Sequence, residues 1–587
     1  MTRRRARIVL GVTDSINGGA ALVVDGRVVA AVNEERLNRV KMATGWPRLS
    51  IAEVLRIGGV APKDVEAVAM SGLTHYWSPQ ALPLKGYFEG ANFGLGKRLL
   101  VGAAARASRL FGGWGPAHAP YYAMKRLLAA RRRREIPREL ESLGIVAPLA
   151  YVDHHLGHAA CAYYAGGEVD ATIVTLDGSG DGLSATAYRG REGTLERVAA
   201  IPAYHSVGNF YSYVTHVLGY KPHQHEGKIT GLAAYGKPLH ADLFRRLVRH
   251  RDGRVENTAR AYNVAAIRLI RRLLPADADP ADVAASIQLV LEEVCTGFVG
   301  HWARRLGPRP LGVAGGVVAN VKLNQRLHAV EGVPSILVHP GMGDDGLGVG
   351  AALFVHAEGL PPAERSGAVH GLDDVYFGPE FDEARIRGAL DGAGLSYEKP
   401  GNLEAAVARA LADKRVVARF HGRMEYGPRA LGNRSVMVHA GDPSVNDWLN
   451  KRFQRTEFMP FAPVTLEEDR RDCYVGLEGA ERPARFMTIT CDCTPKLKET
   501  CPAVVHVDGT ARPQLVGRRE NPGYRKILEE YRKITGLSTV INTSFNMHEE
   551  PIVCTPEDAI RAFTLGHLDY LALGDFLVAA PEAPPGP

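Results

Sequence analysis

Apolar residues recur in short runs separated by glycine-rich turns, a pattern that predicts strands alternating with helices. Residues 8–32 hold three apolar runs, and Asp25-Gly26 between the last two is a strong hairpin signal. Residues 49–58 are expected to form a helix, and residues 65–71 another strand. The first part of the chain therefore predicts a sheet that begins with a hairpin.

From residue 149 the alternation becomes regular, with apolar strands ending in polar or glycine-rich turns. Strands are expected within 149–155, 171–182 and 311–320, and helices within 155–166, 281–306 and 346–359. Residues 357–385 carry Pro and Gly without periodicity, so we place a domain boundary near residue 370. Beyond it we expect a helix at 405–414 and a strand at 415–420, followed by further alternation.

The composition is that of an ordinary globular protein. Of 587 residues, 45% are hydrophobic and 23% are charged, which excludes a disordered or collagen-like chain. The net charge of +7 is modest and does not demand a nucleic-acid partner. The longest apolar stretches, such as residues 311–319, fall short of the roughly 20 residues that a membrane helix needs. We therefore expect neither nucleic acid nor membrane as a partner.

The cysteines and the N-terminus favour a cytoplasmic location. Seven cysteines, an odd and small number, indicate no disulfide framework. Cys491, Cys493 and Cys501 lack the spacing of a zinc site and are expected to be buried on a strand. The apolar run at residues 8–12 is ended by Asp14, so we expect a strand there rather than a secretion signal.

Residues 85–140 lack periodicity and are expected to be irregular and basic, with four consecutive arginines at 131–134. A run of four arginines is usually a solvated helix face. Contact with an anionic substrate or partner is the alternative interpretation.

Two histidines could bind a metal ion. His154 and His158 are four residues apart and would share one face of a helix. Imidazole pairs so placed bind divalent metals, and carboxylates are natural further ligands. Asp177 and Asp344 each follow an apolar strand and are the candidates. A structural role for the histidine pair is the alternative, but the two aspartates favour a metal.

Glycine turns follow several of the apolar strands. They hold Gly178 and Gly180, Gly315 and Gly316 with Asn320, the turn at 341–348 and an early turn at 14–19. Glycine lets backbone N–H groups approach phosphate oxygens, and a neighbouring aspartate can hold a metal. No turn matches the P-loop or the dinucleotide fingerprint, but together they predict a nucleotide cleft between two lobes.

The most basic motif lies in the second half of the chain. Residues 419–434 carry Arg419, Arg423, Arg429 and Arg434 among glycines and a proline, and Arg455 follows. Arginines placed on turns suit forked binding of carboxylates or phosphates. Surface salt bridges are the alternative. Two weaker polar motifs come later, at 506–513 with Arg512 and at 542–546 with Asn542, Thr543 and Ser544.

Taken in order, these motifs resemble the O-carbamoyltransferases of the NodU/CmcH family, which includes enzymes of antibiotic tailoring and nodulation-factor decoration. The matching segments cover the whole chain: 33–41, 153–160, 175–181, 226–236, 315–320, 343–352, 422–435, 458–463, 506–514 and 542–553. The resemblance implies an α/β protein of two domains. Residues 1–370 would form a two-lobed actin/hexokinase-like (ASKHA) domain similar to tRNA threonylcarbamoyl-transfer proteins, and residues 371–587 a YrdC-like domain.

The resemblance also implies a two-step reaction. Carbamoyl phosphate and ATP, with Mg²⁺, would give carbamoyl-adenylate in the second domain. The first domain would then transfer the carbamoyl group to a hydroxyl of a small-molecule acceptor, such as a natural product or sugar of secondary metabolism. The family metal is typically iron, here Fe²⁺ on His154, His158, Asp177 and Asp344, although these ligand types do not by themselves choose iron.

Further roles are carried over to the matching positions of this chain. Lys41, Lys228 and Asp14 would act in catalysis. Arg423, Arg429, Arg455, Arg512, Asn542, Thr543 and Ser544 would hold carbamoyl phosphate and ATP. Gly178, Gly180, Gly315, Gly316 and Asn320 would bind the adenylate.

This chain departs from the family pattern at two places. Many members have His-Asp in the first hairpin turn, where this chain has Ile16-Asn17, and many have Phe-Arg-Pro where it has Phe458-Met459-Pro460. The acceptor and the group that takes its proton are therefore open. tRNA threonylcarbamoyl transfer and a nucleotide-binding regulatory role are the alternatives, and a homodimer is among the oligomeric states open to the chain.

Overall fold

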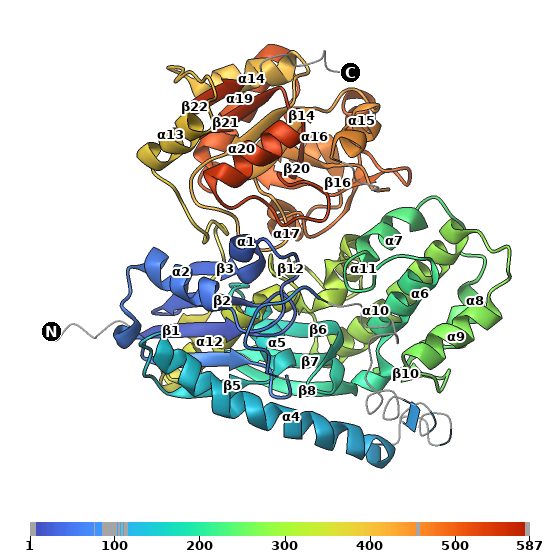
Figure 1. Cartoon of the computed structure of the whole chain (residues 1–587). Helices are drawn as coiled ribbons and strands as arrows, with labels where there is room; N and C mark the ends of the chain where they lie inside the picture. Colours follow the sequence, from blue (N-terminus) through green and yellow to red (C-terminus); the bar gives the residue numbers. More distant parts are fainter. Residues whose placement is uncertain are drawn as a thin grey trace. The chain divides into compact units, whose positions relative to one another are not determined.

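A computed structural model describes residues 7–75, 77–84, 102–103, 106, 110, 115–453 and 458–580 (Figure 1). The chain forms two compact units. The first holds Met1–Val29 and Met42–Gly371, and the second holds Ala30–Lys41 and Leu372–Pro587. The division therefore falls one residue beyond the predicted boundary and places the segment 30–41 in the second unit.

Side-chain contacts explain why the segment 30–41 belongs to the second unit. Arg36 donates a hydrogen bond to the carbonyl of Gly427 at 3.0 Å. Arg39 donates to the carbonyls of Ile552 and Pro551 at 2.7 and 2.8 Å. The segment is thus bound to residues hundreds of positions away, which no local sequence pattern indicates.

Two five-stranded sheets of the same strand order form the frame of the first unit. The first sheet has the order β3-β2-β1-β4-β5 and the second β12-β11-β6-β7-β8. In each, a hairpin pairs antiparallel and two later strands join in parallel on the other side. The bounds are β1 (Ile8–Thr13), β2 (Gly19–Val24), β3 (Arg27–Asn33, of which only residues 27–29 are counted in the first unit), β4 (Ala67–Ser71), β5 (Leu149–Val152), β6 (Asp170–Gly180), β7 (Leu183–Arg191), β8 (Thr194–Pro202), β11 (Leu311–Ala314) and β12 (Ile336–Val338). This repeated order agrees with the expected two lobes.

A small third sheet and the helices complete the first unit. They are β9 (Val248–Arg251), β10 (Arg254–Asn257), α2 (Arg48–Gly58), α4 (Gly115–Ser142), α5 (His154–Tyr164), α6 (Val207–Val217), α7 (Glu226–Ala233), α8 (Ala241–Arg245), α9 (Val264–Leu273), α10 (Pro280–Leu306), α11 (Val321–His328) and α12 (Leu347–Glu358). The predicted helices at 49–58, 281–306 and 346–359 are confirmed. The prediction of irregular structure for residues 85–140 is wrong for residues 115–140, which α4 covers, and most of residues 85–114 lie outside the described residues.

Close backbone approach places α5 and α12 together. A Cβ atom at Gly350 of α12 would lie 2.0 Å from the carbonyl oxygen of Gly157 in α5. A Cβ at Gly11 of β1 would lie 1.9 Å from the carbonyl oxygen of Gly348. Only glycine fits at these crossings, so α12 packs directly between the first sheet and the helix that carries the two histidines.

Among the described residues, α10 is the one helix long and apolar enough to cross a membrane. Of its most apolar 18-residue stretch, 72% is buried inside the fold. It packs against α6, α7 and β9, as a core helix does. All seven cysteines are buried and free. Cys491 and Cys493 lie on a strand as expected, whereas Cys501 follows α18 and is not on a strand.

A seven-stranded sheet forms the centre of the second unit, with the order β19-β15-β20-β14-β13-β21-β22. Its strands are β13 (Val417–Phe420), β14 (Arg434–His439), β15 (Ala462–Leu466), β19 (Gln514–Val516), β20 (Thr539–Ser544), β21 (Tyr570–Leu573) and β22 (Phe576–Ala579), and the smaller sheet has β16 (Tyr474–Val475), β17 (Cys491–Cys493) and β18 (Thr510–Ala511). The helices are α1 (Glu34–Asn38), α13 (Glu383–Gly392), α14 (Leu403–Ala412), α15 (Val445–Arg452), α16 (Arg470–Cys473), α17 (Glu481–Arg485), α18 (Pro495–Thr500), α19 (Pro522–Thr535) and α20 (Pro556–Leu565). Residues of α14 and α19 share one apolar core with the sheet. The unit is α/β as expected, and its YrdC-like identity stays a prediction.

Candidate functional site

Two histidines of α5 face each other at the start of that helix. The side chain of Asp153 caps the helix by accepting a hydrogen bond from the backbone N–H of Leu156 at 3.0 Å. His154 and His158 then lie one turn apart, and their Nε2 atoms are 3.1 Å apart. Both side chains are buried. The helical placement predicted for this pair is confirmed.

Two aspartates complete a metal-ligand group, the name we use for His154, His158, Asp177 and Asp344. The carboxylate of Asp177, on β6, lies 3.0 Å from His154 Nε2. The Oδ1 atom of Asp344, which precedes α12, lies 3.6 Å from the Nε2 atoms of both histidines. One nitrogen or oxygen atom from each of the four residues lies within 4.8 Å of the others. Folding therefore brings together residues that are up to 190 positions apart in the chain.

Opposite charges define the electrostatics of this group. Burial by itself would lower the pKa of His154, but the carboxylates of Asp344 and Asp177 raise it to about 9. Burial would raise the pKa of Asp177, but hydrogen bonding and attraction to His154 hold it well below its usual range. Two imidazole nitrogens and two carboxylates converging on one point are the donor set that first-row divalent metals take. The residues present therefore fit a metal ion.

The glycine turns surround the metal-ligand group. The backbone N–H of Gly316 donates to Asp177 at 3.0 Å. A Cβ at Gly315, whose φ is +109°, would lie 2.3 Å from the carbonyl oxygen of Leu176. A Cβ at Gly180 would lie 1.9 Å from the His154 ring. These three glycines, predicted to bind an adenylate, thus pack against His154, against Asp177 or against β6, the strand that carries Asp177.

The two other predicted adenylate residues lie nearby. Gly178 lies next to the Asn209 side chain, since a Cβ at Gly178 would be 3.3 Å from that amide oxygen. Asn320 caps α11 through the backbone N–H of Leu323 and exchanges hydrogen bonds with Gln288. The side chain of Asn320 is therefore engaged within the fold.

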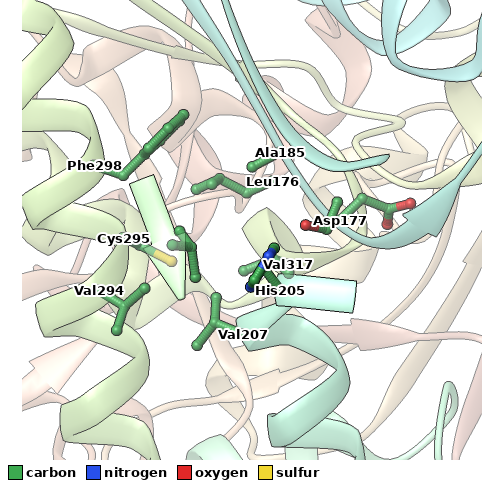
Figure 2. Close-up of a pocket in the computed structure, with 11 residues that line it drawn as sticks. Leu176, Asp177, Ala185, His205, Val207, Val294, Cys295, Phe298 and Val317 are labelled. Carbon is green, nitrogen blue, oxygen red and sulfur yellow. The ribbon is translucent and has the colours of Figure 1, made fainter. Parts of the chain in front are cut away.

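A small apolar cavity lies beside Asp177 (Figure 2). Its lining includes Leu176, Val207, Val294, Cys295, Phe298 and Val317. The Asp177 carboxylate points away from these apolar side chains. The room inside is about 10 Å³, no more than one water molecule needs. The cavity is therefore a packing void and is too small for a nucleotide base.

Asp14, at the end of β1, is bound by an arginine that the sequence analysis did not single out. Both carboxylate oxygens of Asp14 accept hydrogen bonds from Arg132 of α4, each at 2.7 Å. Arg132 is completely buried and also donates to the carbonyls of Ser71 and Gly72. Burial by itself would raise the pKa of Asp14, but Arg132 and His75 lower it to about 2. The carboxylate is thus charged and already neutralised by a guanidinium.

His75 is a second residue that sequence analysis missed. Its Nδ1 atom lies 3.8 Å from Asp14, and its ring centroid lies 6.0 Å from that of His154. The solvated helix face expected for Arg131–Arg134 is confirmed except at Arg132. No sequence signal beyond the basic run marks Arg132, because residues 115–142 show almost no apolar stripe that would tell the inner face of the helix.

The two predicted catalytic lysines lie in different units. Lys228 is on α7 and is buried. Lys41 ends the segment 30–41 and is exposed.

The arginine loop, residues 419–434 of the second unit, is organised around a buried carboxylate. Glu425 Oε1 accepts hydrogen bonds from the backbone N–H groups of Leu431, Asn433 and Arg434, at 2.7 to 3.0 Å. A carboxylate that receives three N–H groups fixes the loop conformation tightly. The loop is therefore a rigid scaffold.

Two of the loop arginines hold this scaffold and do not face a ligand. Arg434 is completely buried, lies over the Phe420 ring at 3.6 Å and donates to four backbone carbonyls. These carbonyls belong to His421, Gly422, Asn433 and Pro379. Arg419 is also buried and donates to the carbonyl of Gly432 at 2.6 Å. Forked anion binding is therefore the wrong interpretation for these two side chains.

Asn542 connects two of the segments that carry the other predicted residues of the second unit. The Asn542 side chain donates to the carbonyl of Ala430, next to Arg429, and to Gln514, two residues after Arg512. Asn542 thus joins the segments that carry Arg429 and Arg512, which are both half-buried. Thr543 and Ser544 follow Asn542 at the end of β20. Arg423 is half-buried and donates to the carbonyl of Phe377, and Arg455 lies outside the described residues.

Comparisons with known proteins divide the chain in the same way as the two units, except for the segment 30–41. Residues 8–353 match the family described as Carbamoyltransferase N-terminus, and residues 408–580 match Carbamoyltransferase C-terminus. Together with the two α/β units, these matches define the class of protein as a transferase. The chain belongs to the carbamoyltransferase family.

Relatives support this assignment over most of the chain. Nodulation protein NolNO of Sinorhizobium fredii is 32% identical over 97% of this chain and 80% of its own length. Nodulation protein NolO of Bradyrhizobium diazoefficiens is 33% identical over 73% of this chain and 78% of its own length. The crystal structure of T. kodakarensis HypF covers 62% of this chain and 48% of that one at 15% identity, with a TM-score of 0.31. A score that low does not establish a common fold.

Proposed function

We propose that this carbamoyltransferase uses ATP to make carbamoyl-adenylate from carbamoyl phosphate and then carbamoylates a hydroxyl of a small molecule. In the first step, carbamoyl phosphate, ATP and water would give carbamoyl-adenylate, phosphate and pyrophosphate. In the second, the acceptor oxygen would bond to the carbamoyl carbon as AMP leaves. The observation that carries the proposal is the convergence of the metal-ligand group in a chain of this family.

The second unit is the proposed place of the first step. Arg429 and Arg512 are half-buried on segments that Asn542 joins. Guanidinium groups on a rigid loop are suited to phosphates, because little side-chain freedom is lost when they bind. We assign Thr543 and Ser544 to the same site as hydroxyl donors to phosphate, and Mg²⁺ to the ATP phosphates.

The first unit is the proposed place of the transfer. His154, His158, Asp177 and Asp344 would hold a divalent metal, with Fe²⁺ as the proposed ion. Such an ion, when bound, polarises a carbonyl or phosphoryl oxygen. The chain's own contribution is to hold the four ligands in register, with both histidines buried and both aspartates half-buried, which α5, β6 and the residues before α12 do. Lys228, buried on α7, is proposed to stabilise the negative charge of a bound phosphate in this unit. Lys41 is proposed to do the same in the second unit.

The acceptor is proposed to be a hydroxylated small molecule of secondary metabolism. The Arg132 guanidinium already neutralises Asp14, so this carboxylate offers no free charge to a cationic acceptor. The turn after Asp14 holds no other ionisable side chain, since it reads Ser15-Ile16-Asn17. These two features favour an uncharged hydroxyl group as the recognised part of the acceptor.

The first experiment uses purified protein with ATP, Mg²⁺ and carbamoyl phosphate and no acceptor. Pyrophosphate release and the mass of carbamoyl-adenylate are followed, with carbamoyl phosphate omitted as the control. We expect both products only when carbamoyl phosphate is present. Pyrophosphate release that is independent of carbamoyl phosphate, or its absence even with a pool of hydroxylated acceptors, would overturn the proposal.

A further inference from the structure

The rings of the two histidine ligands lack the support that such ligands usually have. In metal sites, the ring nitrogen that does not face the metal normally donates to a carboxylate or carbonyl, which fixes the orientation of the ring. The Nδ1 atoms of His154 and His158 are buried and have no hydrogen-bond partner among the described residues. The orientation of these rings must therefore come from another contact.

Asp181 binds the backbone of His154 without belonging to the metal-ligand group. It follows β6, and its Oδ2 atom accepts a hydrogen bond from the backbone N–H of His154 at 2.9 Å. The same carboxylate accepts from the backbone N–H groups of Leu73 and Thr74 and from the Thr74 hydroxyl, each at 2.8 Å. One side chain thus connects the residues that follow β4, β5 and β6.

The turn that carries Asp181 holds His154 at two further points. The Gly180 α-carbon packs directly against the His154 imidazole, since a Cβ at Gly180 would lie 1.9 Å from the Cδ2 atom of His154. The Asp177 carboxylate lies 3.0 Å from the Nε2 atom of the same ring. His154 is therefore held at its backbone N–H, at its ring face and at its ligating nitrogen by three residues of one turn.

We propose that Asp181 is the positioning residue of the metal-ligand group, acting through the backbone of His154 and not as a ligand. This inference rests on the metal site of the proposed function. An anionic carboxylate at the first N–H group of α5 also stabilises the start of this helix. The same carboxylate also binds residues 73–74. Metal binding, which fixes His154, should therefore also reduce the motion of the loop that contains residues 73–74. The same segment carries His75, whose Nδ1 atom lies 3.8 Å from Asp14, so the coupling extends to Asp14.

The test measures binding of Co²⁺, whose visible absorption reports its ligands, to the purified full chain. Asp181→Asn keeps the shape of the side chain but places an amide N–H against N–H donors. We expect Asp181→Asn to raise the Co²⁺ dissociation constant by about 10- to 100-fold, the range for loss of an outer-sphere partner. Thr74→Val, which removes one of the four hydrogen bonds and none to His154, is expected to change it less than about threefold.

Asp279→Asn is the matched control. Asp279 also accepts a backbone N–H at the start of a helix of the same unit, from Ala281 at 2.7 Å, but it belongs to α10. We expect wild-type Co²⁺ affinity in this variant. Wild-type affinity in a folded Asp181→Asn protein, or an equal loss in Asp279→Asn, would overturn the inference.

A measurement on the wild-type chain covers the case that Asp181→Asn does not fold. Amide hydrogen exchange with and without Co²⁺ is compared in peptides that contain Leu73 and Thr74. We expect Co²⁺ to slow exchange there, although neither residue is a ligand. Slowing confined to residues 153–158 would overturn the inference and leave the metal site intact. If Co²⁺ binds equally well to His158→Ala, the metal site of the proposed function itself fails, and the inference fails with it.

Discussion

Both units bury charged side chains, but those of the metal-ligand group contact one another, whereas those of the arginine loop mostly contact backbone carbonyls. In the first unit, all four predicted metal ligands direct a ring nitrogen or a carboxylate oxygen toward one point. In the second unit, Arg419 and Arg434 donate hydrogen bonds to backbone carbonyls of the loop, and Arg429 is half-buried. The comparison teaches that residue type and spacing identify a motif, while burial and hydrogen-bond partners decide which members bind a ligand.

The metal-ligand group predicts the largest single effect. His158→Ala removes one ligand, and we expect carbamate formation to fall by more than the roughly 100-fold that loss of an outer-sphere partner can cost. Carbamoyl-adenylate formation, assigned to the second unit, should be unchanged. Separate assays of pyrophosphate release and of carbamate product check this. Equal loss of both steps would contradict the assignment of the steps to different units.

Arg434→Met tests the scaffold role of the arginine loop. It leaves several buried carbonyls without donors, and we expect the unfolding free energy to fall by about 3 kcal/mol. Denaturant unfolding measures this, with Arg409→Met, an exposed arginine of α14, as the control. A wild-type unfolding midpoint in Arg434→Met would show that the carbonyls find other partners.

Arg429→Met sharpens the comparison within the same loop. Arg429 is half-buried, so we expect little change in stability but a loss of about 10- to 100-fold in carbamoyl-adenylate formation, since a charged hydrogen bond is removed. Transfer from supplied carbamoyl-adenylate should survive. If Arg429→Met instead behaves like Arg434→Met, both arginines belong to the scaffold.

The pH dependence of stability gives the smallest predicted effect. The pKa of Asp14 is about 2 in the folded chain and 3.8 when unperturbed, so its charge stabilises the fold above pH 4. This contribution, about 2 kcal/mol, should be lost as the pH falls from 4 to 2. Denaturant midpoints measured across this range, in wild type and Asp14→Asn, check it. An identical acid slope in both proteins would contradict the Arg132 pairing.

Much of the local structure could be predicted because its signals are local. The hairpin at Asp25-Gly26 and the helix 281–306 follow from turn chemistry and apolar periodicity, and both are present. The helix α4 was missed because residues 115–142 show almost no apolar stripe. Without a stripe, the burial of Arg132 against Asp14 had no sequence signal beyond its basic run.

The candidate site likewise has a part that could be predicted from local sequence signals and a part that depends on long-range packing. The sequence by itself determined the histidine pair on one helix face, because that placement depends on spacing along a few residues. The order of motifs along the whole chain indicated the family. Both aspartates were expected to follow strands, but Asp177 lies within β6. Only the tertiary structure decided that Arg132 neutralises Asp14, that Asp181 holds His154 and the loop after β4, and that Arg434 is scaffold. The physical reason is that a buried charge takes its partner from whatever the fold places beside it, and that neighbour is set by packing between distant segments.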